Sequence, residues 1–574
     1  MDLSVAIKLK DSKEKIDIEK PFKLVAGPGA GKTTFLVNHI KNILNNSSRL
    51  SKARKIACIT YTNVGVDTII NRLNGALDNV EVGTIHNFLY SNVVKPYLWV
   101  LDSEFSFDYK NIDGHDEVIP GHKILDEWRN NTNQKYLIKY DKKLIKAFSH
   151  LKWIYKEENI KLEFSNVYDS KIEDNISIRR NSLLEYKKIC WSQGLISHDD
   201  VLFLSYKIIL KQPRVLEILR AKYPYLIIDE FQDTNPIQTY IVNKIAEKET
   251  VVGVIGDEWQ SIYEFQGANL EDFENFSVEN IQLYKLENNH RSTQQIIDVL
   301  NDIRNEKDFL QISPEVKIGD KPYIITGSFF DAYEKASEIC NGEDLFTLTY
   351  VNKMSNILKY NYEDKGYESP EDLINELRTF DGDRGKLILN VIYSIEYCRQ
   401  NRIKEAIKYM KKAYRKVSTL DDFSEREALK IMSKILSNYD SFSKQNIKDF
   451  YLNNIHKVYN KASKIQGGQK AEFYTNLLYK NVALAIKLDN DDNSKYKTIH
   501  KSKGDEYDNV LVVISDRYDR ERARNLEFLL NPDKNDEQDR LYYVALSRAK
   551  KRLFINVPSL SKKDKVNLGR FNIV

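Results

Sequence analysis

A glycine-rich octapeptide, AGPGAGKT at residues 26–33, constrains the fold of this chain more than any other feature. It follows the apolar run FKLVA at 22–26, which is typical of a buried strand, and it opens a segment with helical spacing at 32–44. Glycines allow backbone N–H groups to face an anion, and a helix N-terminus adds favourable partial charge. The order strand, glycine loop, helix therefore predicts a phosphate-binding loop, although Ala26 stands where the usual pattern has glycine.

The residues of this loop have distinct expected roles. Lys32 is expected to reach the β- and γ-phosphates of a nucleotide, and Thr33 is expected to hold Mg²⁺. The full set of expected nucleotide contacts in the loop is Gly27, Gly29, Gly31, Lys32, Thr33 and Thr34. The alternative is a glycine-rich turn before an ordinary helix.

A second element carries the acids that nucleotide hydrolysis requires. The segment YLIIDEFQD places Asp229 and Glu230 at the end of an apolar strand. A carboxylate there can bind Mg²⁺, and its neighbour can orient or deprotonate the attacking water. We assign Asp229 to the metal and Glu230 to the water. The alternative is a strand end capped by solvated acids.

The rest of the chain alternates apolar strands with helices near both ends. Further strands are expected at 55–62, 225–229, 251–257, 323–327, 345–351, 510–515 and 552–557. Strands this apolar, alternating with helices, predict an α/β fold with parallel sheets covered on both faces. The 574 residues suggest roughly three to five domains or subdomains. We therefore expect a first core at 1–90 and 199–285 with a mainly helical insertion at 91–198, and a second core at 286–354 and 491–574 with a mainly helical insertion at 355–490.

Composition narrows the class of protein. The 87 basic and 83 acidic residues nearly balance, so net charge neither supports nor excludes a nucleic-acid partner. Four cysteines without a Cys-x-x-Cys pair argue against a disulfide framework, a zinc ribbon or an iron–sulfur cluster. The first 20 residues lack the apolar core of a signal peptide, and no run of about 18 apolar residues appears. We expect a cytoplasmic protein with no membrane partner.

Nine segments together resemble the motifs of the UvrD/Rep-like group of superfamily 1 DNA helicases. They are AGPGAGKT (26–33), ITYTNVGVDTIINRL (59–73), VGTIHNF (82–88), HDDVLFL (198–204), DEFQDTNPIQ (229–238), GDEWQSIYEFQGA (256–268), LENNHRS (286–292), TIHKSKGDEYDNV (498–510) and DRLYYVALSRAK (539–550). Their order and spacing extend the resemblance over nearly the whole length. The resemblance implies two RecA-like, P-loop NTPase cores with ATP and Mg²⁺ between them and DNA across their top.

The resemblance also implies roles for residues outside the phosphate loop. Gln260 would sense the γ-phosphate, and Arg291 and Arg548 would approach it from the second core. Planar cations suit the charge of the phosphoryl transition state, because Arg does not lose its proton; the alternative for both is a surface salt bridge. Glu506 would contact the ribose, and His290 takes the position of the ring that stacks on the base. The upstream glutamine that reads adenine in this family is missing from residues 1–25.

For DNA, the resemblance implies contacts along both cores. The matching positions are Thr62, Asn63, Thr84, His86, Tyr263, Phe265 and His500. Tyr263 and Phe265 match aromatic residues that stack on bases, a sequence-independent contact. The alternative for both rings is packing in the core.

Three functions remain open from the sequence. The first is an ATP-driven helicase or translocase moving 3′ to 5′ on single-stranded DNA, with the direction implied by the resemblance. The second is a DNA-responsive ATPase subunit that works with a partner nuclease in DNA repair or phage defence, as in systems of the Gabija type. The third is an NTPase unrelated to nucleic acid, against which Tyr263, Phe265 and the segments at 59–73 and 498–510 argue.

Overall fold

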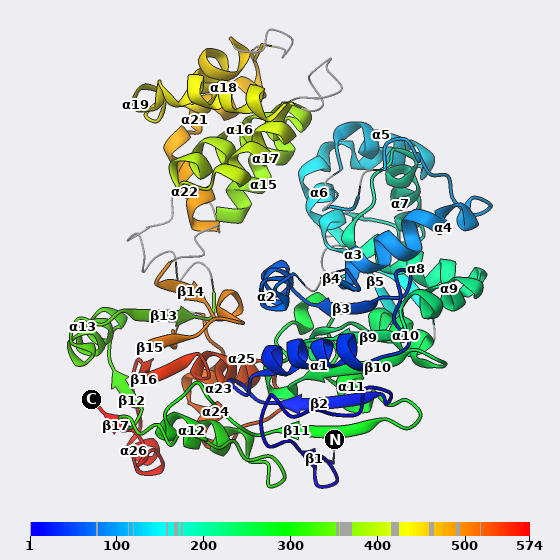
Figure 1. The fold of residues 1–574 in the computed structure, drawn as a ribbon. Helices are drawn as coiled ribbons and strands as arrows, with labels where there is room; N and C mark the ends of the chain where they lie inside the picture. Colours follow the sequence, from blue (N-terminus) through cyan, green and yellow to red (C-terminus); the bar gives the residue numbers. More distant parts are fainter. Residues whose placement is uncertain are drawn as a thin grey trace.

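Two parallel β-sheets organise the protein (Figure 1). The computed structural model describes residues 2–75, 78–112, 114–116, 118, 120–156, 159–165, 170–173, 176–351, 355, 370–414, 424–457, 464–465, 467–489, 494–516 and 518–574. Every strand pair in the two sheets is parallel. The predicted α/β class is therefore confirmed. Among the described residues, no helix combines the length and the apolar character that a membrane crossing requires.

The first sheet contains the glycine loop and the acidic strand end. Its strands are β1 (Ile7–Lys8), β2 (Phe22–Ala26), β3 (Ile56–Thr60), β4 (Val80–Thr84), β9 (Tyr225–Ile228), β10 (Val251–Gly256) and β11 (Gln282–Leu286). They lie in the order β1-β11-β2-β10-β9-β3-β4. The strands β1, β4 and β11 were not predicted, because they are short or carry polar residues between the apolar ones.

Alternate residues of these strands face opposite layers of helices, as the strand period of two requires. Leu24 packs with α1 (Lys32–Asn46) and α2 (Asn63–Leu73). Its neighbour Val25 packs on the other face, where α8 (His198–Lys211), α9 (Arg214–Lys222) and α10 (Pro236–Ala246) lie. The central strands are consequently buried on both faces.

The second sheet repeats this plan with later residues. Its strands are β12 (Tyr323–Thr326), β13 (Leu345–Thr349), β14 (Tyr496–Thr498), β15 (Tyr507–Val513), β16 (Ala549–Val557) and β17 (Asn572–Ile573), in the order β14-β13-β15-β16-β12-β17. Val510 packs with α12 (Gln294–Arg304) and α25 (Glu537–Leu546), whereas Leu511 packs with α13 (Phe329–Cys340).

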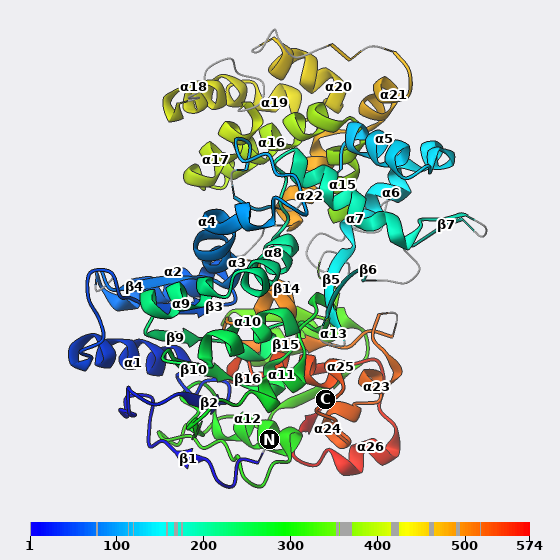
Figure 2. The same ribbon diagram turned by 90° about the vertical axis from the view of Figure 1, so that its right-hand side faces the viewer.

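Two further bodies lie on the same side of the two sheets (Figures 1 and 2). The first contains α5 (His122–Asn131), α6 (Asp141–Ser149), α7 (Leu183–Ser192) and the hairpin β7 (Lys171–Glu173)–β8 (Ile176–Ser177). The hairpin β5 (Leu151–Lys156)–β6 (Asn159–Phe164) extends from it onto the first core, where Trp153 packs in the apolar cluster of α8 and α10. The second contains α15 (Pro370–Phe380), α16 (Gly382–Arg399), α17 (Ile403–Tyr414), α18 (Glu425–Leu436), α21 (Gln469–Asn476) and α22 (Tyr479–Asp489). The two hairpins were not predicted. The insertion at 355–490 lies partly outside the described residues, and the division of the chain at 91, 199, 286, 355 and 491 stays a prediction.

The two cores pack directly on each other. The turn η7 (Glu258–Gln260) follows β10 of the first sheet, yet Trp259 belongs to the apolar cluster of the second core, together with Ile262. The carboxyl ends of the strands of the first core, where ligands bind in parallel sheets, therefore lie next to the second core.

Candidate nucleotide site and DNA-facing surface

The glycine loop has the backbone that the sequence predicts. Gly29 and Gly31 have positive φ angles of 71° and 86°, and Gly31 is the residue that precedes α1. A Cβ atom at position 29 would lie 2.6 Å from Asn289 Oδ1 and 2.7 Å from Arg291 Cβ. Glycine is thus required there for two reasons, conformation and space. The first turn of α1 contains no acidic residue, so its positive end is not neutralised locally.

The acid pair lies beside Lys32. Lys32 Nζ is 3.8 Å from Glu230 Oε1, and the Glu230 N–H donates to Asp229 Oδ1 at 3.0 Å. Glu230 has a φ of 53°, a strained conformation for a residue other than glycine and one that is common at functional sites. The structure therefore brings together the three predicted residues Lys32, Asp229 and Glu230.

The two carboxyl groups have opposite pKa shifts. Burial, and then the negative charge of Glu230, raises the pKa of Asp229. Burial would also raise the pKa of Glu230, but the charges of Lys32 and Lys503 lower it. Glu230 is thus held as the carboxylate, the form that accepts a proton.

Gln260 lies in the buried turn η7 next to these acids. Its Nε2 donates to Asp257 Oδ2 at 2.7 Å, and its backbone oxygen accepts from Lys503 Nζ at 2.7 Å. Lys503 also pairs with Asp233. Lys503 and Asp233 lie within segments that we identified, at 498–510 and 229–238, but sequence reasoning did not single them out.

Arg291 and Arg548 reach the edge of the site from the second core. Arg548 is 2% exposed and donates to Val544 O at 3.0 Å and to Asp505 O at 3.1 Å. Burial, and then the neighbouring Arg291, lowers its pKa to about 9. Arg548 therefore does not form the surface salt bridge that was its alternative interpretation. Arg291 does form an ion pair, because its Nε lies 2.9 Å from Glu506 Oε2.

His290 lies against the glycine loop, next to Arg291. Its backbone N–H donates to Gly29 O at 3.0 Å, and its side chain is 40% exposed. Thr34 follows the loop and accepts from Arg72 Nη1 at 3.4 Å. A cavity of about 380 Å³ beside Thr34 is lined by the N-terminal segment 13–15 and by α1.

Four aromatic side chains lie together where the two cores meet, and we refer to Tyr61, Tyr263, Phe265 and His500 as the aromatic platform. Tyr263 stacks on Tyr61 with ring centroids 4.9 Å apart. Phe265 is 58% exposed, and its ring centroid lies 5.2 Å from that of His500. Tyr263 is half-buried and packs on the second core, so the stacking and the core interpretations each describe part of its surroundings. Tyr61 was not predicted, although it lies in the motif segment 59–73.

The other predicted DNA contacts lie at helix starts. Thr62 Oγ1 accepts from Gly65 N at 3.0 Å and caps α2, which Asn63 opens. Thr84 Oγ1 accepts from Asn87 N at 3.4 Å and caps α3 (Ile85–Leu89). Each cap pairs with one backbone N–H group, and the other N–H groups of the first turn remain available to an outside acceptor.

His86 is the second residue of α3, next to the start that Thr84 caps, and its ring lies in a group of three histidines. Its ring centroid is 5.9 Å from that of His198, and His115 lies beside both rings. Burial, followed by the charges of His198 and His115, lowers the pKa of His86 to about 3. Any contact that His86 makes with DNA at neutral pH would therefore be made by an uncharged ring.

Comparisons with known proteins agree with this geometry. The UvrD/REP helicase N-terminal domain matches residues 10–280, and the UvrD-like helicase C-terminal domain matches residues 342–559. The chain is 26% identical to DNA helicase II of Rickettsia typhi over 300 residues, which cover 51% of this chain and 44% of that protein. It is 28% identical to the ATP-dependent DNA helicase PcrA of Bacillus subtilis over 294 residues, 49% of this chain and 37% of that protein.

A further relative matches over almost its entire length. The chain is 26% identical to the Gabija protein GajB of Bacillus cereus (strain HuB5-5) over 642 aligned positions, which cover 92% of this chain and 91% of that protein. The matched regions of the Rickettsia helicase II relatives and of Bacillus subtilis PcrA are less than half of the lengths of those proteins.

Proposed function

Since the chain belongs to the UvrD/Rep-like group of superfamily 1 DNA helicases, we propose that it hydrolyses ATP between its two cores and thereby moves 3′ to 5′ along single-stranded DNA and unwinds duplex. One observation carries the proposal. Glu230 of the first core, which pairs with Lys32, lies within electrostatic reach of Arg548 of the second core. Closure of the cores on a nucleotide would place cations on both sides of its γ-phosphoryl group.

The residues present fit a magnesium nucleotide. Buried Asp229 and partly buried Glu230 lie near Lys32, and a divalent cation offsets the negative charge of two neighbouring carboxylates. Thr33 and Asp229 would hold Mg²⁺, which supplies positive charge to the phosphate oxygens when bound. The loop glycines Gly27, Gly29 and Gly31 with Lys32 and Thr34 would hold the phosphates, Glu506 the ribose, and His290 the base.

In hydrolysis, each side chain has a separate task. Glu230 would accept a proton from the attacking water, for which its lowered pKa keeps it ionised. Gln260 would sense the γ-phosphate and connect it to the aromatic platform, since Tyr263 of the platform lies three residues further along the chain. Arg291 and Arg548 would stabilise the negative charge of the transition state.

For DNA, the aromatic platform supports stacking of bases, with Phe265 as its most exposed ring. The helix starts at Thr62, Asn63 and Thr84, together with His86, would contact the phosphate backbone.

The test compares ATP turnover with and without single-stranded DNA, and strand separation on duplexes with a 3′ or a 5′ tail. We expect DNA-stimulated turnover and separation of the 3′-tailed duplex. Lys32→Ala is the matched control and removes both, because the phosphate cradle loses its cation. A preference for the 5′ tail contradicts the direction, and turnover that is indifferent to DNA contradicts the DNA-driven function.

A second candidate function is favoured by the match to the Gabija protein, which spans 91% of that relative. In this alternative the chain is a DNA-responsive ATPase subunit that works with a partner nuclease in DNA repair or phage defence. It predicts DNA-stimulated turnover without strand separation on forked DNA, and a nuclease encoded by the neighbouring gene. Strand separation by the isolated chain favours the first function.

A further inference from the structure

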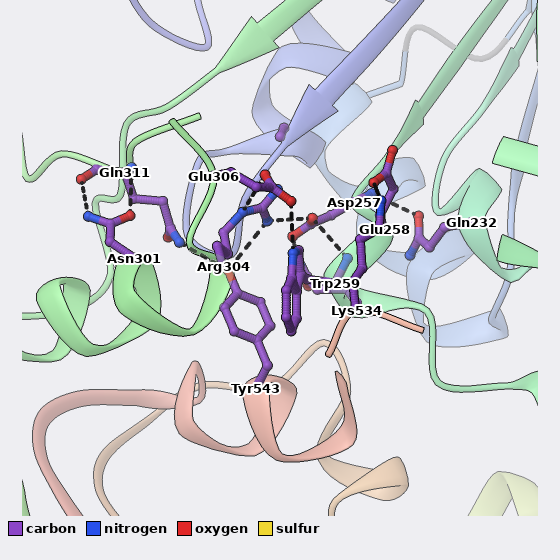
Figure 3. Close-up of polar contacts among 12 residues, drawn as sticks. Gln232, Asp257, Glu258, Trp259, Asn301, Arg304, Glu306, Gln311, Lys534 and Tyr543 are labelled. Atoms are coloured by element: carbon purple, nitrogen blue, oxygen red, sulfur yellow. Dashed lines mark hydrogen bonds and ion pairs between the residues drawn. The ribbon is translucent and has the colours of Figure 1, made fainter. Parts of the chain in front are cut away.

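A buried arginine, Arg304, joins the two cores behind the nucleotide site (Figure 3). It is the last residue of α12, which packs on the second core. Its Nη1 lies 2.6 Å from Oδ1 of Asp257, which follows β10 of the first core, and the two side chains are 1% and 0% exposed. This ion pair is therefore shielded from water and crosses from one core to the other.

The rest of the guanidinium is held as firmly. Arg304 Nη2 lies 2.9 Å from Glu306 Oε2, and the group stacks over the Phe309 ring at 4.2 Å. Tyr543 of α25 covers it from below in Figure 3. Burial opposes the charge, but Asp257, Tyr543 and Glu306 together raise the pKa of Arg304 well above its ordinary value. The residue is thus a fixed cation.

Asp257 connects Arg304 to the proposed nucleotide site. While its Oδ1 accepts from Arg304, its Oδ2 accepts from Nε2 of Gln260 at 2.7 Å. The orientation of an amide is set by its hydrogen-bond partners. Arg304 fixes the carboxylate, and the carboxylate fixes the amide that the proposed function assigns to the γ-phosphate.

A second branch reaches the glycine loop. Tyr543 Oη accepts from Gln311 Nε2 at 3.0 Å, and Gln311 Oε1 accepts from Asn289 Nδ2 at 3.0 Å. A Cβ atom at Gly27 would lie 3.3 Å from Gln311 Cδ. Arg304 therefore lies between two contacts with the proposed nucleotide site, one at Gln260 and one at Gly27.

Stability alone does not account for a charge at this position. A buried ion pair is often no more stabilising than apolar residues of similar volume, and the rings of Phe309 and Tyr543 offer an apolar residue good surroundings. An ion pair does, however, fix direction and register in a way that an apolar contact does not.

We propose that Arg304 is a positioning residue for DNA-stimulated ATP hydrolysis, which orients Gln260 through Asp257 across the contact between the cores. The inference rests on the proposed ATPase function and adds a residue from α12, outside the motif segments, to it. In this role Arg304 acts through Asp257 and not directly on the phosphates or the water.

The experiment measures kcat and KM for ATP with saturating single-stranded DNA in Arg304→Met. We expect kcat to fall about 3- to 30-fold, the size typical of a change in coupling between sites, while KM changes less than about twofold. Arg129→Met is the matched control, because Arg129 is also buried and paired with Asp126 and Asp141, but lies in α5, far along the chain from the nucleotide site. It should lower the melting temperature without changing the ratio of stimulated to DNA-free turnover.

Two milder variants test the same role. Arg304→Lys keeps the charge and should restore part of kcat, and Tyr543→Phe removes one hydroxyl and should lower kcat less than Arg304→Met. The indole N–H of Trp259 donates to Glu306 Oε1 at 2.9 Å, so Trp259 emission, isolated by subtracting a Trp259→Phe variant, should shift in Arg304→Met.

The outcomes separate the two proposals. Wild-type turnover that DNA does not stimulate refutes the proposed function. DNA-stimulated wild-type turnover with an unchanged kcat in folded Arg304→Met overturns the inference alone. If Arg304→Met does not fold, unchanged kcat in both Arg304→Lys and Tyr543→Phe overturns it equally.

Discussion

At the scale of single residues, Glu230 is the most specific test of the chemistry. Lys32 and Lys503 keep it ionised in a strained backbone conformation. We predict that Glu230→Gln binds ATP but hydrolyses it about 10²- to 10⁴-fold more slowly, the usual contribution of a general base. Single-turnover hydrolysis and binding of a fluorescent ATP analogue measure the two effects. Glu247→Gln, at an exposed position, serves as the control. Near-normal turnover in Glu230→Gln would show that Glu230 is not the general base.

A second residue-scale prediction concerns acid stability. The ring of His39 is 5% exposed between Phe22 and Phe35, and burial lowers its pKa from 6.5 to about 4. Because the unfolded chain binds the proton more tightly, the stability from this site is complete above about pH 6.5 and is lost as the pH falls towards 4. The loss at pH 5 is about 2 kcal/mol.

Urea unfolding at pH 7.5 and pH 5 measures this loss. His39→Leu keeps an apolar side chain and should make the stability less dependent on pH over this range. An equal pH dependence in the wild type and in His39→Leu contradicts the prediction.

Residues of the site were predicted where a short sequence motif surrounds them, and were missed where the partner lies far away along the chain. The structure brings together Lys32, Asp229 and Glu230, which lie in short motifs whose neighbouring residues indicate their chemistry. Arg304 has no such pattern, because a basic residue in the last turn of a helix usually complements the helix dipole. Its partner Asp257 lies 47 positions away along the chain, and a single sequence does not reveal the pair.

At the scale of elements, the aromatic platform combines the residue that follows β3, the segment that follows η7, and η10 (His500–Ser502). We predict that Phe265→Ala weakens single-strand binding by about 1–3 kcal/mol, the value of one base stacked on an aromatic ring. Because Phe265 is 58% exposed, its loss should barely change the melting temperature. Tyr263→Ala should weaken binding less and destabilise the fold more, since its ring also packs on Tyr61.

Fluorescence anisotropy with labelled oligonucleotides measures the binding, and a thermal melt measures the fold. A large fall in the melting temperature of Phe265→Ala would show a core role, as buried large-to-small changes cost about 3–5 kcal/mol.

We expect the segment before the glycine loop to govern recognition of the base. Residues 1–25 contain no glutamine that could hydrogen-bond the edge of adenine. A site rejects the wrong base strongly when that base leaves a buried polar group without its hydrogen bond. A site that makes no hydrogen bond to the edge of the base therefore discriminates weakly. We predict weak discrimination between ATP and GTP, measured as the ratio of kcat/KM with saturating DNA. A preference for ATP beyond about a thousandfold, or roughly 4 kcal/mol, contradicts it.

The elements themselves were predictable where burial is complete. The strands β2, β9 and β10 are continuous apolar runs and were predicted to within a residue at either end. The strands β4 and β11 read VEVGT and QLYKL, and their pairing depends on long-range neighbours rather than on composition.

At the scale of the whole molecule, the two bodies above the cores meet through ion pairs near the surface and through a contact of Lys142 with the Phe380 ring. Lys142 lies 2.7 Å from Glu376, and Lys412 lies 3.2 Å from Asp116. In the second pair the side chains are 57% and 72% exposed, and such pairs contribute about 0–1 kcal/mol and weaken with salt. We therefore predict that the distance between α6 and α15, measured by fluorescence energy transfer, increases from low to high salt.

The charge reversal Glu376→Lys should give the larger distance already at low salt, and Lys142→Glu combined with it should restore the shorter one. A distance that is independent of both salt and these changes would show that other contacts hold the bodies together.

The strands of the two sheets are consecutive along the chain, since those of the first end at residue 286 and those of the second begin at residue 323. On a ribosome the first sheet is therefore complete when half of the polypeptide exists, and translation of the remainder takes roughly 15–60 s. During this interval Trp259 and Ile262, which are buried against the second core in the finished protein, have no cover. The nascent chain thus presents an apolar surface of the kind that chaperones bind and from which premature association starts.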